Sequence, residues 1–220
     1  MRNGSIKTKK CEVKKMKKQI RKMAVFLFTL VLLAPMFSTN AEAATGYQGY
    51  AIYRDGVFYG YDWHAGMMDD PYRDTTSLPV LHAPGSGSVV SWDSWSNFMK
   101  GNNFKGVYRP NRAPTTSERD LFVSMGRNLR TENITYNVAY QVYYDTGSSG
   151  TWVDPSEVSS MRCDGVVEYI FEWYSFRIYG SDTYWDVTRN SFWGRDHHSG
   201  TAITPKKQVG YMTLVKSTAP

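Results

Sequence analysis

The first 43 residues differ sharply in composition from the rest of the chain, and this division decides which residues are available to build a fold. They contain ten Lys or Arg residues but only two Glu, and an apolar run from Met23 to Phe37 follows the basic stretch. Ala41-Glu42-Ala43 then supplies the small-x-small pattern of a signal-peptide cleavage site. The apolar run is shorter than the roughly 20 residues of a membrane-spanning helix. We therefore expect residues 1–43 to be a secretory signal peptide and residues 44–220 to form one domain without stable membrane insertion, secreted or associated with the cell wall.

The net charge of +6 belongs mainly to this N-terminal segment. Of the 26 basic and 20 acidic residues, 16 basic and 18 acidic residues lie after residue 43. The remaining part is therefore close to neutral and carries no basic stripe. Nucleic acid is not expected as a partner, because its phosphates are bound by clustered Lys and Arg side chains.

Cys163 is the single cysteine after residue 43, so the domain has to fold without an intramolecular disulfide bond. An unpaired thiol in an exported protein has two interpretations. It is either a buried small hydrophobic residue or a reactive nucleophile. The sequence around it must decide between them.

The apolar patterns predict an α+β domain, in which a small antiparallel sheet has helices packed on one side. Short strands are expected within residues 46–61, 63–68, 79–83, 106–108 and 210–215, with turn residues between most of them. A helix is expected after Thr115, which forms a Thr-x-x-Glu capping box with Glu118. A second helix is expected to follow Cys163, with Glu168 and Glu172 on the side opposite its apolar residues.

Cys163 thus lies at the predicted start of a helix. The helix dipole and the unpaired N–H groups of the first turn favour a thiolate there, and Arg162 adds a positive charge. The same N–H groups can stabilise an oxyanion during attack on an amide carbonyl. These features favour the nucleophile interpretation.

A thiol nucleophile needs a base, and the base needs a group that orients it. His64 and His82 lie in two short predicted strands that are close in sequence, so they can be neighbours in one sheet. Each of them can also be an ordinary strand histidine with a satisfied hydrogen bond. Asp196-His197-His198 lacks the spacing of a metal-binding cluster, so no metal ion or other cofactor is predicted.

The order of these segments resembles the permuted papain-like, or permuted NlpC-type, hydrolases, which include the YiiX-like amidases. Trp63-His64-Ala65-Gly66-Met67 resembles the histidine strand of that group, and Val80-Leu81-His82-Ala83 resembles its next strand. Arg162-Cys163-Asp164-Gly165-Val166-Val167 resembles the start of the nucleophile helix, and Thr135-Tyr136-Asn137 resembles the Tyr-containing segment before it. The resemblance covers roughly residues 48–175 and departs from the family where Asp164 stands in place of a common Ser.

The resemblance implies a papain-like fold, with Cys163 as nucleophile, His64 as general base and His82 as the orienting residue. The expected function is a cysteine amidase or peptidase that acts as a monomer on a peptidoglycan peptide or another amide. Permuted relatives also include lipid acyltransferases and thioesterases, so acyl esters are a second expectation. The third is a non-catalytic wall- or glycan-binding module, with Trp92, Trp95, Trp173, Trp185 and Trp193 lining a groove rather than packing a core.

Overall fold

The computed structural model describes residues 44–73, 78–144, 153–178 and 204–220, which all belong to one compact unit, Ala43–Pro220. The predicted signal segment lies outside the described residues, and so do His197, His198, Trp185 and Trp193. Within the described ranges, no helix combines the length and the apolar character needed to cross a membrane.

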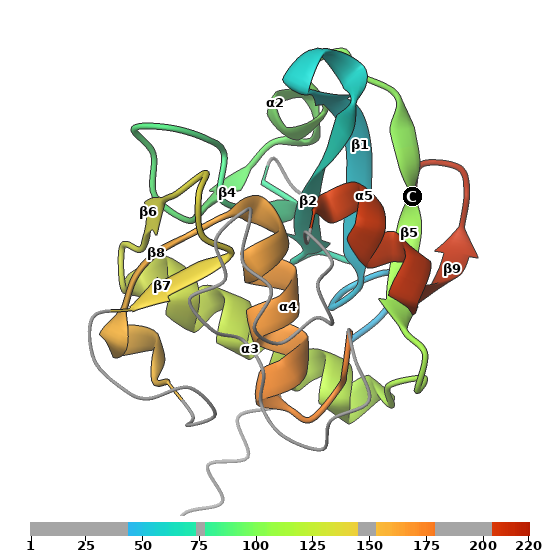
Figure 1. Ribbon diagram of the computed structural model, residues 1–220. Coiled ribbons are helices and arrows are strands. Elements are labelled where there is room, and N and C mark those ends of the chain that lie inside the picture. The colour runs from blue at the N-terminus through green and yellow to red at the C-terminus, as the bar shows by residue number, and fades with distance from the viewer. Residues whose placement is uncertain (1–43, 74–77, 145–152, 179–203) are drawn as a thin grey trace, which may run out of the picture. The chain divides into compact units, whose positions relative to one another are not determined.

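A six-stranded antiparallel sheet forms the centre of this unit, with the strand order β4-β3-β2-β1-β5-β9 (Figure 1). Its strands, in chain order, are β1 (Ala51–Val57), β2 (Asp62–Met68), β3 (Val80–His82), β4 (Ser91–Asp93), β5 (Phe104–Pro110) and β9 (Met212–Lys216). A one-turn 3-10 helix, η1 (Phe58–Gly60), joins β1 to β2. Strands predicted around residues 63–68, 79–83, 106–108 and 210–215 are confirmed, with boundaries that shift by a few residues.

A smaller, three-stranded sheet has the order β6-β8-β7. It comprises β6 (Thr135–Tyr136), β7 (Val142–Tyr144) and β8 (Val158–Met161), preceded by a one-turn helix, η2 (Pro155–Glu157). This sheet leads directly into the helix that begins at Cys163.

The two long helices pack on one face of the central sheet. They are α3 (Thr116–Thr131) and α4 (Cys163–Trp173). Strand residues that point to this face, such as Tyr53, Ala65 and Leu81, share one buried cluster with residues of both helices. The short helix α5 (Pro205–Gln208) also reaches this face, where Gln208 bonds Tyr53 of β1, and η3 (Val209–Tyr211) continues from it to β9.

The opposite face of the sheet is covered by a short helix, α2 (Trp95–Met99). Its Phe98 is fully buried in a second cluster with Ile52, Met68 and Val80, which alternate with the residues of the first face. The predicted α+β architecture is therefore confirmed, while α2 adds a helix on the side where none was expected.

Both predicted helix starts are confirmed. Thr115 caps α3 in a full capping box with Glu118, and α4 begins at Cys163. Glu168 and Glu172 were expected on the side of α4 opposite its apolar residues. That side of the helix is also covered, because both residues are buried.

Candidate functional site

Cys163 is the first residue of α4, and the chain reaches it directly from β8. Gly165, in the first turn, allows the helix to lie against the backbone that precedes β7. A Cβ atom at this position would lie only 1.9 Å from the Gln141 carbonyl oxygen. A side chain at residue 165 would therefore push the start of α4, and the thiol with it, away from its present place.

The two predicted histidines meet in the central sheet. His64 lies on β2 and His82 on β3, and the His64 Nε2 and His82 Nδ1 atoms are 2.7 Å apart. The two strands are paired between Met67 and Leu81, which places the two rings diagonally on the face of the sheet that Phe98 of α2 covers. This is a hydrogen-bond distance, so the expected neighbour relation between His64 and His82 is found.

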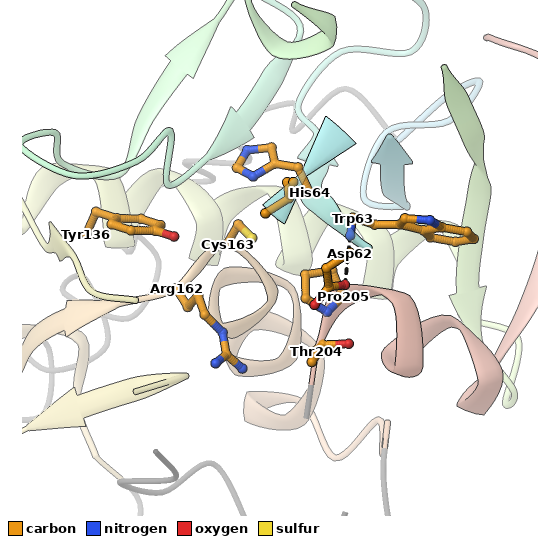
Figure 2. A pocket seen from close by; sticks show the side chains of 9 residues that line it. Asp62, Trp63, His64, Tyr136, Arg162, Cys163, Thr204 and Pro205 are labelled. Carbon is orange, nitrogen blue, oxygen red and sulfur yellow. Dashed lines mark hydrogen bonds between the residues drawn. The ribbon is translucent and has the colours of Figure 1, made fainter. Parts of the chain in front are cut away.

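A small pocket contains both His64 and Cys163 (Figure 2). Its free volume is about 30 Å³, which is room for one or a few water molecules. The pocket also has wall residues from β1, β2, β6 and the starts of α4 and α5, namely Val57, Asp62, Trp63, Tyr136, Arg162, Thr204 and Pro205. In the close-up, the His64 ring is directed toward the side of the pocket where the Cys163 sulfur lies.

Both histidines are held neutral by their surroundings. Burial lowers the pKa of His64 well below its usual 6.5, and the neighbouring His82 ring and the buried Arg54 guanidinium lower it further. Burial also lowers the pKa of His82 to about 4, although Asp93 opposes this shift. The ring of Phe98 lies 5.6 Å from that of His64 and 5.3 Å from that of His82, between ring centroids. This apolar contact disfavours charged imidazolium.

The predicted lowering of the Cys163 pKa is wrong. Burial, followed by the Asp164 carboxylate, raises the pKa of the thiol to about 12. The positive charge of Arg162 does not act on the sulfur alone. Its Nε and Nη2 atoms bond both oxygens of Asp164 at 2.6 and 2.7 Å. Cys163 is therefore a neutral thiol at neutral pH, and any reaction has to remove its proton as the sulfur attacks.

Asp93 is a site residue that the sequence analysis missed. Its Oδ2 lies 3.3 Å from His82 Nε2, so the hydrogen-bonded chain runs from His64 through His82 to a carboxylate. We call these three residues the histidine relay. Asp93 stands on a strand of three residues, and so short a segment has no periodicity from which to predict it. The one local feature is Ser94, which caps α2 immediately after Asp93.

Tyr136 is the second residue of β6 and lines the same pocket. Burial, followed by the nearby Cys163 and Asp164, raises the pKa of its phenol to about 12. The hydroxyl therefore keeps its proton across the physiological range and can donate a hydrogen bond near Cys163.

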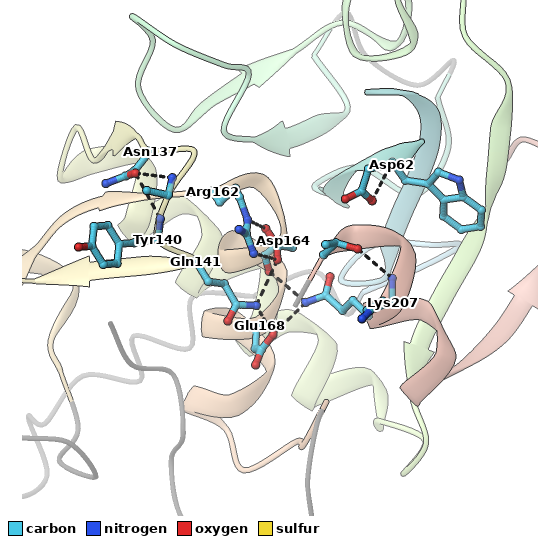
Figure 3. Close-up of polar contacts among 12 residues, drawn as sticks. Asp62, Asn137, Tyr140, Gln141, Arg162, Asp164, Glu168 and Lys207 are labelled. Atoms are coloured by element: carbon cyan, nitrogen blue, oxygen red, sulfur yellow. Dashed lines mark hydrogen bonds and ion pairs between the residues drawn. The ribbon is translucent and has the colours of Figure 1, made fainter. Parts of the chain in front are cut away.

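A second set of buried polar side chains gathers around the first turns of α4 (Figure 3). We call it the α4 network, which consists of Gln141, Arg162, Asp164, Glu168 and Gln208. Gln141 Nε2 donates to Glu168. Gln208 Nε2 donates to the Glu168 carboxylate and to the Asp164 carbonyl, both at 3.1 Å. Tyr53 donates to Gln208 Oε1 at 2.8 Å.

The α4 network explains why residues after 203 belong to the site. Gln208 connects α5 to both α4 and β1, and the Lys206 N–H donates to the Asp62 carboxylate at 3.2 Å. These bonds hold Thr204 and Pro205 in the pocket wall. The sequence contained no pattern that assigned this role to the C-terminal segment.

The described tryptophans do not form one aromatic groove. Trp95 packs against Phe98 and Phe104 on the α2 face of the sheet. Trp92 lies under the guanidinium of Arg130, and Trp173 stacks on Tyr169 with ring centroids 5.7 Å apart. These three side chains support different parts of the core and its rim.

No protein-family model matches the chain, and no curated protein or solved structure matches it either.

Proposed function

We propose that the protein is a cysteine hydrolase that cleaves amide bonds through an acyl-enzyme on Cys163. The observation that carries this proposal is the meeting of three residues: a thiol at the start of α4 shares a pocket with His64, and His64 bonds His82 at 2.7 Å. A nucleophile, a base and an orienting group are the minimum for this chemistry.

The first half of the reaction forms the acyl-enzyme. His64 takes the thiol proton as the sulfur attacks the carbonyl carbon, and the carbonyl oxygen becomes an oxyanion. The Tyr136 hydroxyl, which lines the pocket, and backbone N–H groups at the start of α4 can donate to this oxyanion. The amine then leaves with the proton that His64 returns, and the acyl group remains on Cys163 as a thioester.

The second half releases the acyl group. His64 accepts a proton from water as the water oxygen attacks the thioester carbonyl. The sulfur then leaves and recovers its proton. Because the thiol and the imidazole both begin neutral, this mechanism does not require a thiolate before the substrate binds.

The chain order supports a papain-like arrangement of the permuted type. The two histidine strands, β2 and β3, come before the nucleophile helix α4 in the sequence. An expected signal peptide and this order together favour a cell-wall peptide as substrate. Acyl esters are the alternative substrate within the same mechanism.

The test is digestion of purified muropeptides, followed by mass spectrometry of the products. We expect new amine and carboxyl termini with the wild-type protein and none with Cys163→Ala. Ser124→Ala, an exposed change on α3, is the matched control and should keep full activity. Full hydrolysis by Cys163→Ala would rule out the mechanism, and hydrolysis of acyl esters alone would move the substrate to that class.

One observation favours a binding function as the second candidate. Tyr59 and Tyr61, at the turn beside the pocket residue Trp63, are both largely exposed. Exposed aromatic rings of this kind suit the faces of sugars. Retention on insoluble peptidoglycan that is lost in Tyr59→Ala/Tyr61→Ala but unchanged in Cys163→Ala, without any hydrolysis, would favour a wall-binding module.

A further inference from the structure

The far end of the histidine relay is rigidly held. Asp93 Oδ1 accepts two hydrogen bonds, from the Ser94 backbone N–H at 3.0 Å and from Asn97 Nδ2 at 2.7 Å. Its other oxygen, Oδ2, faces His82 Nε2. Both donors on Oδ1 belong to the start of α2, so the carboxylate cannot turn without losing both of these bonds.

This fixed carboxylate determines where His82 carries its hydrogen. An ionised carboxylate only accepts hydrogen bonds, so His82 Nε2 must be the protonated nitrogen. The opposite arrangement would place a nitrogen lone pair against a carboxylate oxygen 3.3 Å away, which is repulsive.

The position of the hydrogen on His82 also determines the position of the hydrogen on His64, because both rings are neutral. His64 and His82 are 4% and 0% exposed, and their lowered pKa values leave one hydrogen on each ring. His82 Nδ1 is then an acceptor, so the hydrogen in the bond of 2.7 Å belongs to His64 Nε2. His64 Nδ1 is left with a free lone pair.

We propose that Asp93 is a positioning residue: through His82, it makes Nδ1 of His64 the unprotonated nitrogen, which is the nitrogen that can take the thiol proton. The catalytic meaning of this arrangement rests on the proposed function, whereas the position of the hydrogens does not. When His64 takes the thiol proton, its Nε2–H still donates to His82. The negative carboxylate of Asp93 then stabilises the imidazolium without any further proton transfer.

Asp93→Asn gives the sharpest test, because the two donors also fix the new amide. The amide oxygen has to remain on Ser94 N–H and Asn97 Nδ2, so the amide NH₂ faces His82 Nε2. His82 must then accept at Nε2 and donate from Nδ1, and His64 must carry its hydrogen on Nδ1. His64 Nδ1 then has no lone pair with which to accept a proton.

Histidine tautomers are read directly from ¹⁵N–¹H correlation spectra of the ¹⁵N-histidine-labelled protein at pH 7.5. His64→Gln and His82→Gln assign the signals. We expect Nε2–H forms of both rings in the wild type, Nδ1–H forms in Asp93→Asn and a mixture in Asp93→Ala. Asp55→Asn is the matched control, because Asp55 lies on β1 of the same sheet and is also held by an asparagine, Asn103. It should leave both tautomers unchanged.

Kinetics with muropeptides should follow the tautomers. Asp93→Asn should lower kcat/KM more than Asp93→Ala does, by about 10⁴-fold against about 10-fold, since the corresponding tautomer reversal in serine proteases costs about 10⁴-fold in turnover. A residue with a purely structural role would give the opposite order, because Asn fills the space of Asp and Ala does not.

Each outcome decides the question. Nδ1–H forms in the wild type, or unchanged tautomers in Asp93→Asn, would overturn the proposal. Should Asp93→Asn fail to fold, the wild-type spectrum and the mixture expected in Asp93→Ala still decide it. If the wild-type protein shows Nε2–H forms but hydrolyses no amide, the assigned hydrogen positions are correct and only the proposed function is wrong.

Discussion

The histidine relay and the α4 network are both buried polar systems beside one pocket, but they are built from different chemistry. The relay joins two neutral rings to a single carboxylate, and its residues lie on three consecutive strands of one sheet. The α4 network joins two carboxylates to a guanidinium and two amides. Its residues come from parts of the chain that are up to 67 positions apart, from Gln141 to Gln208.

This difference indicates a division of roles. A chain of neutral hydrogen bonds has a direction, so it can control which nitrogen is protonated at the pocket. A network of charges and amides is expensive to leave incomplete, so it fixes the elements that it connects. We therefore expect changes in the relay to reduce reactivity and changes in the α4 network to reduce stability.

The largest expected effect belongs to the relay. His64→Gln should lower kcat/KM by about 10⁴-fold, or about 5 kcal/mol in the barrier, because it removes the proposed general base. The free energy of unfolding should change by less than about 2 kcal/mol. Steady-state kinetics and urea titration measure the two quantities. A loss of stability as large as the increase in the catalytic barrier would contradict the division of roles.

Asp164→Ala should produce the largest loss of stability in the α4 network. It leaves the Arg162 guanidinium, which is 6% exposed, without the carboxylate that it bonds twice. Removing one partner of a buried ion pair costs about 3–5 kcal/mol. Urea denaturation should show this loss. The double variant Arg162→Met/Asp164→Leu should recover much of it, and a loss below about 1 kcal/mol in Asp164→Ala would show that the network does not fix α4.

The neutral rings of the relay also make stability depend on pH. The pKa of His82 falls from 6.5 to about 4 on folding, so the unfolded state binds more protons between these values and stability falls as pH falls through this window. Complete loss of the His82 contribution is about 3 kcal/mol, and His64 acts in the same direction. Urea midpoints at pH 7.5 and 4.5 should show the decrease. A slope that is the same in His82→Gln would contradict the assignment.

Gln208→Leu should have the smallest effect of the four. It removes the acceptor for Tyr53 and the donor to Glu168 while keeping a similar volume. Losing these bonds inside a buried polar cluster costs about 2 kcal/mol. Because Thr204 and Pro205 line the pocket beside it, KM should rise more than kcat falls. If the variant is less stable but its KM is unchanged, the C-terminal segment does not shape the pocket.

The sequence predicted those parts of the molecule that depend on local patterns. The capping box at Thr115 and the apolar spacing after Cys163 placed both long helices, and the strands of His64 and His82 were expected. Asp93 was missed because its strand has only three residues, and only the pairing of this strand with β3 brings Asp93 close to His82.

The electrostatics of the site could not be predicted from local patterns. The helix start favours a thiolate, but burial and Asp164 outweigh it and raise the pKa of Cys163. Glu168 was expected on the side of α4 opposite its apolar residues, yet Gln141 and Gln208 arrive from distant segments and enclose it. Both results depend on tertiary packing, which residue spacing along one element does not contain.

The central claim is that Cys163 and His64 act as one thiol–imidazole pair, and intact-mass spectrometry during reaction with an N-acetylalanine p-nitrophenyl ester tests it most directly. We predict that acid-quenched wild-type protein carries one acetylalanyl group, that peptide mapping places it on Cys163, and that it forms at least 100-fold more slowly in His64→Gln, or about 3 kcal/mol in the barrier. Acylation at the same rate in His64→Gln, or no acyl group on Cys163 while the ester is consumed, would contradict the account.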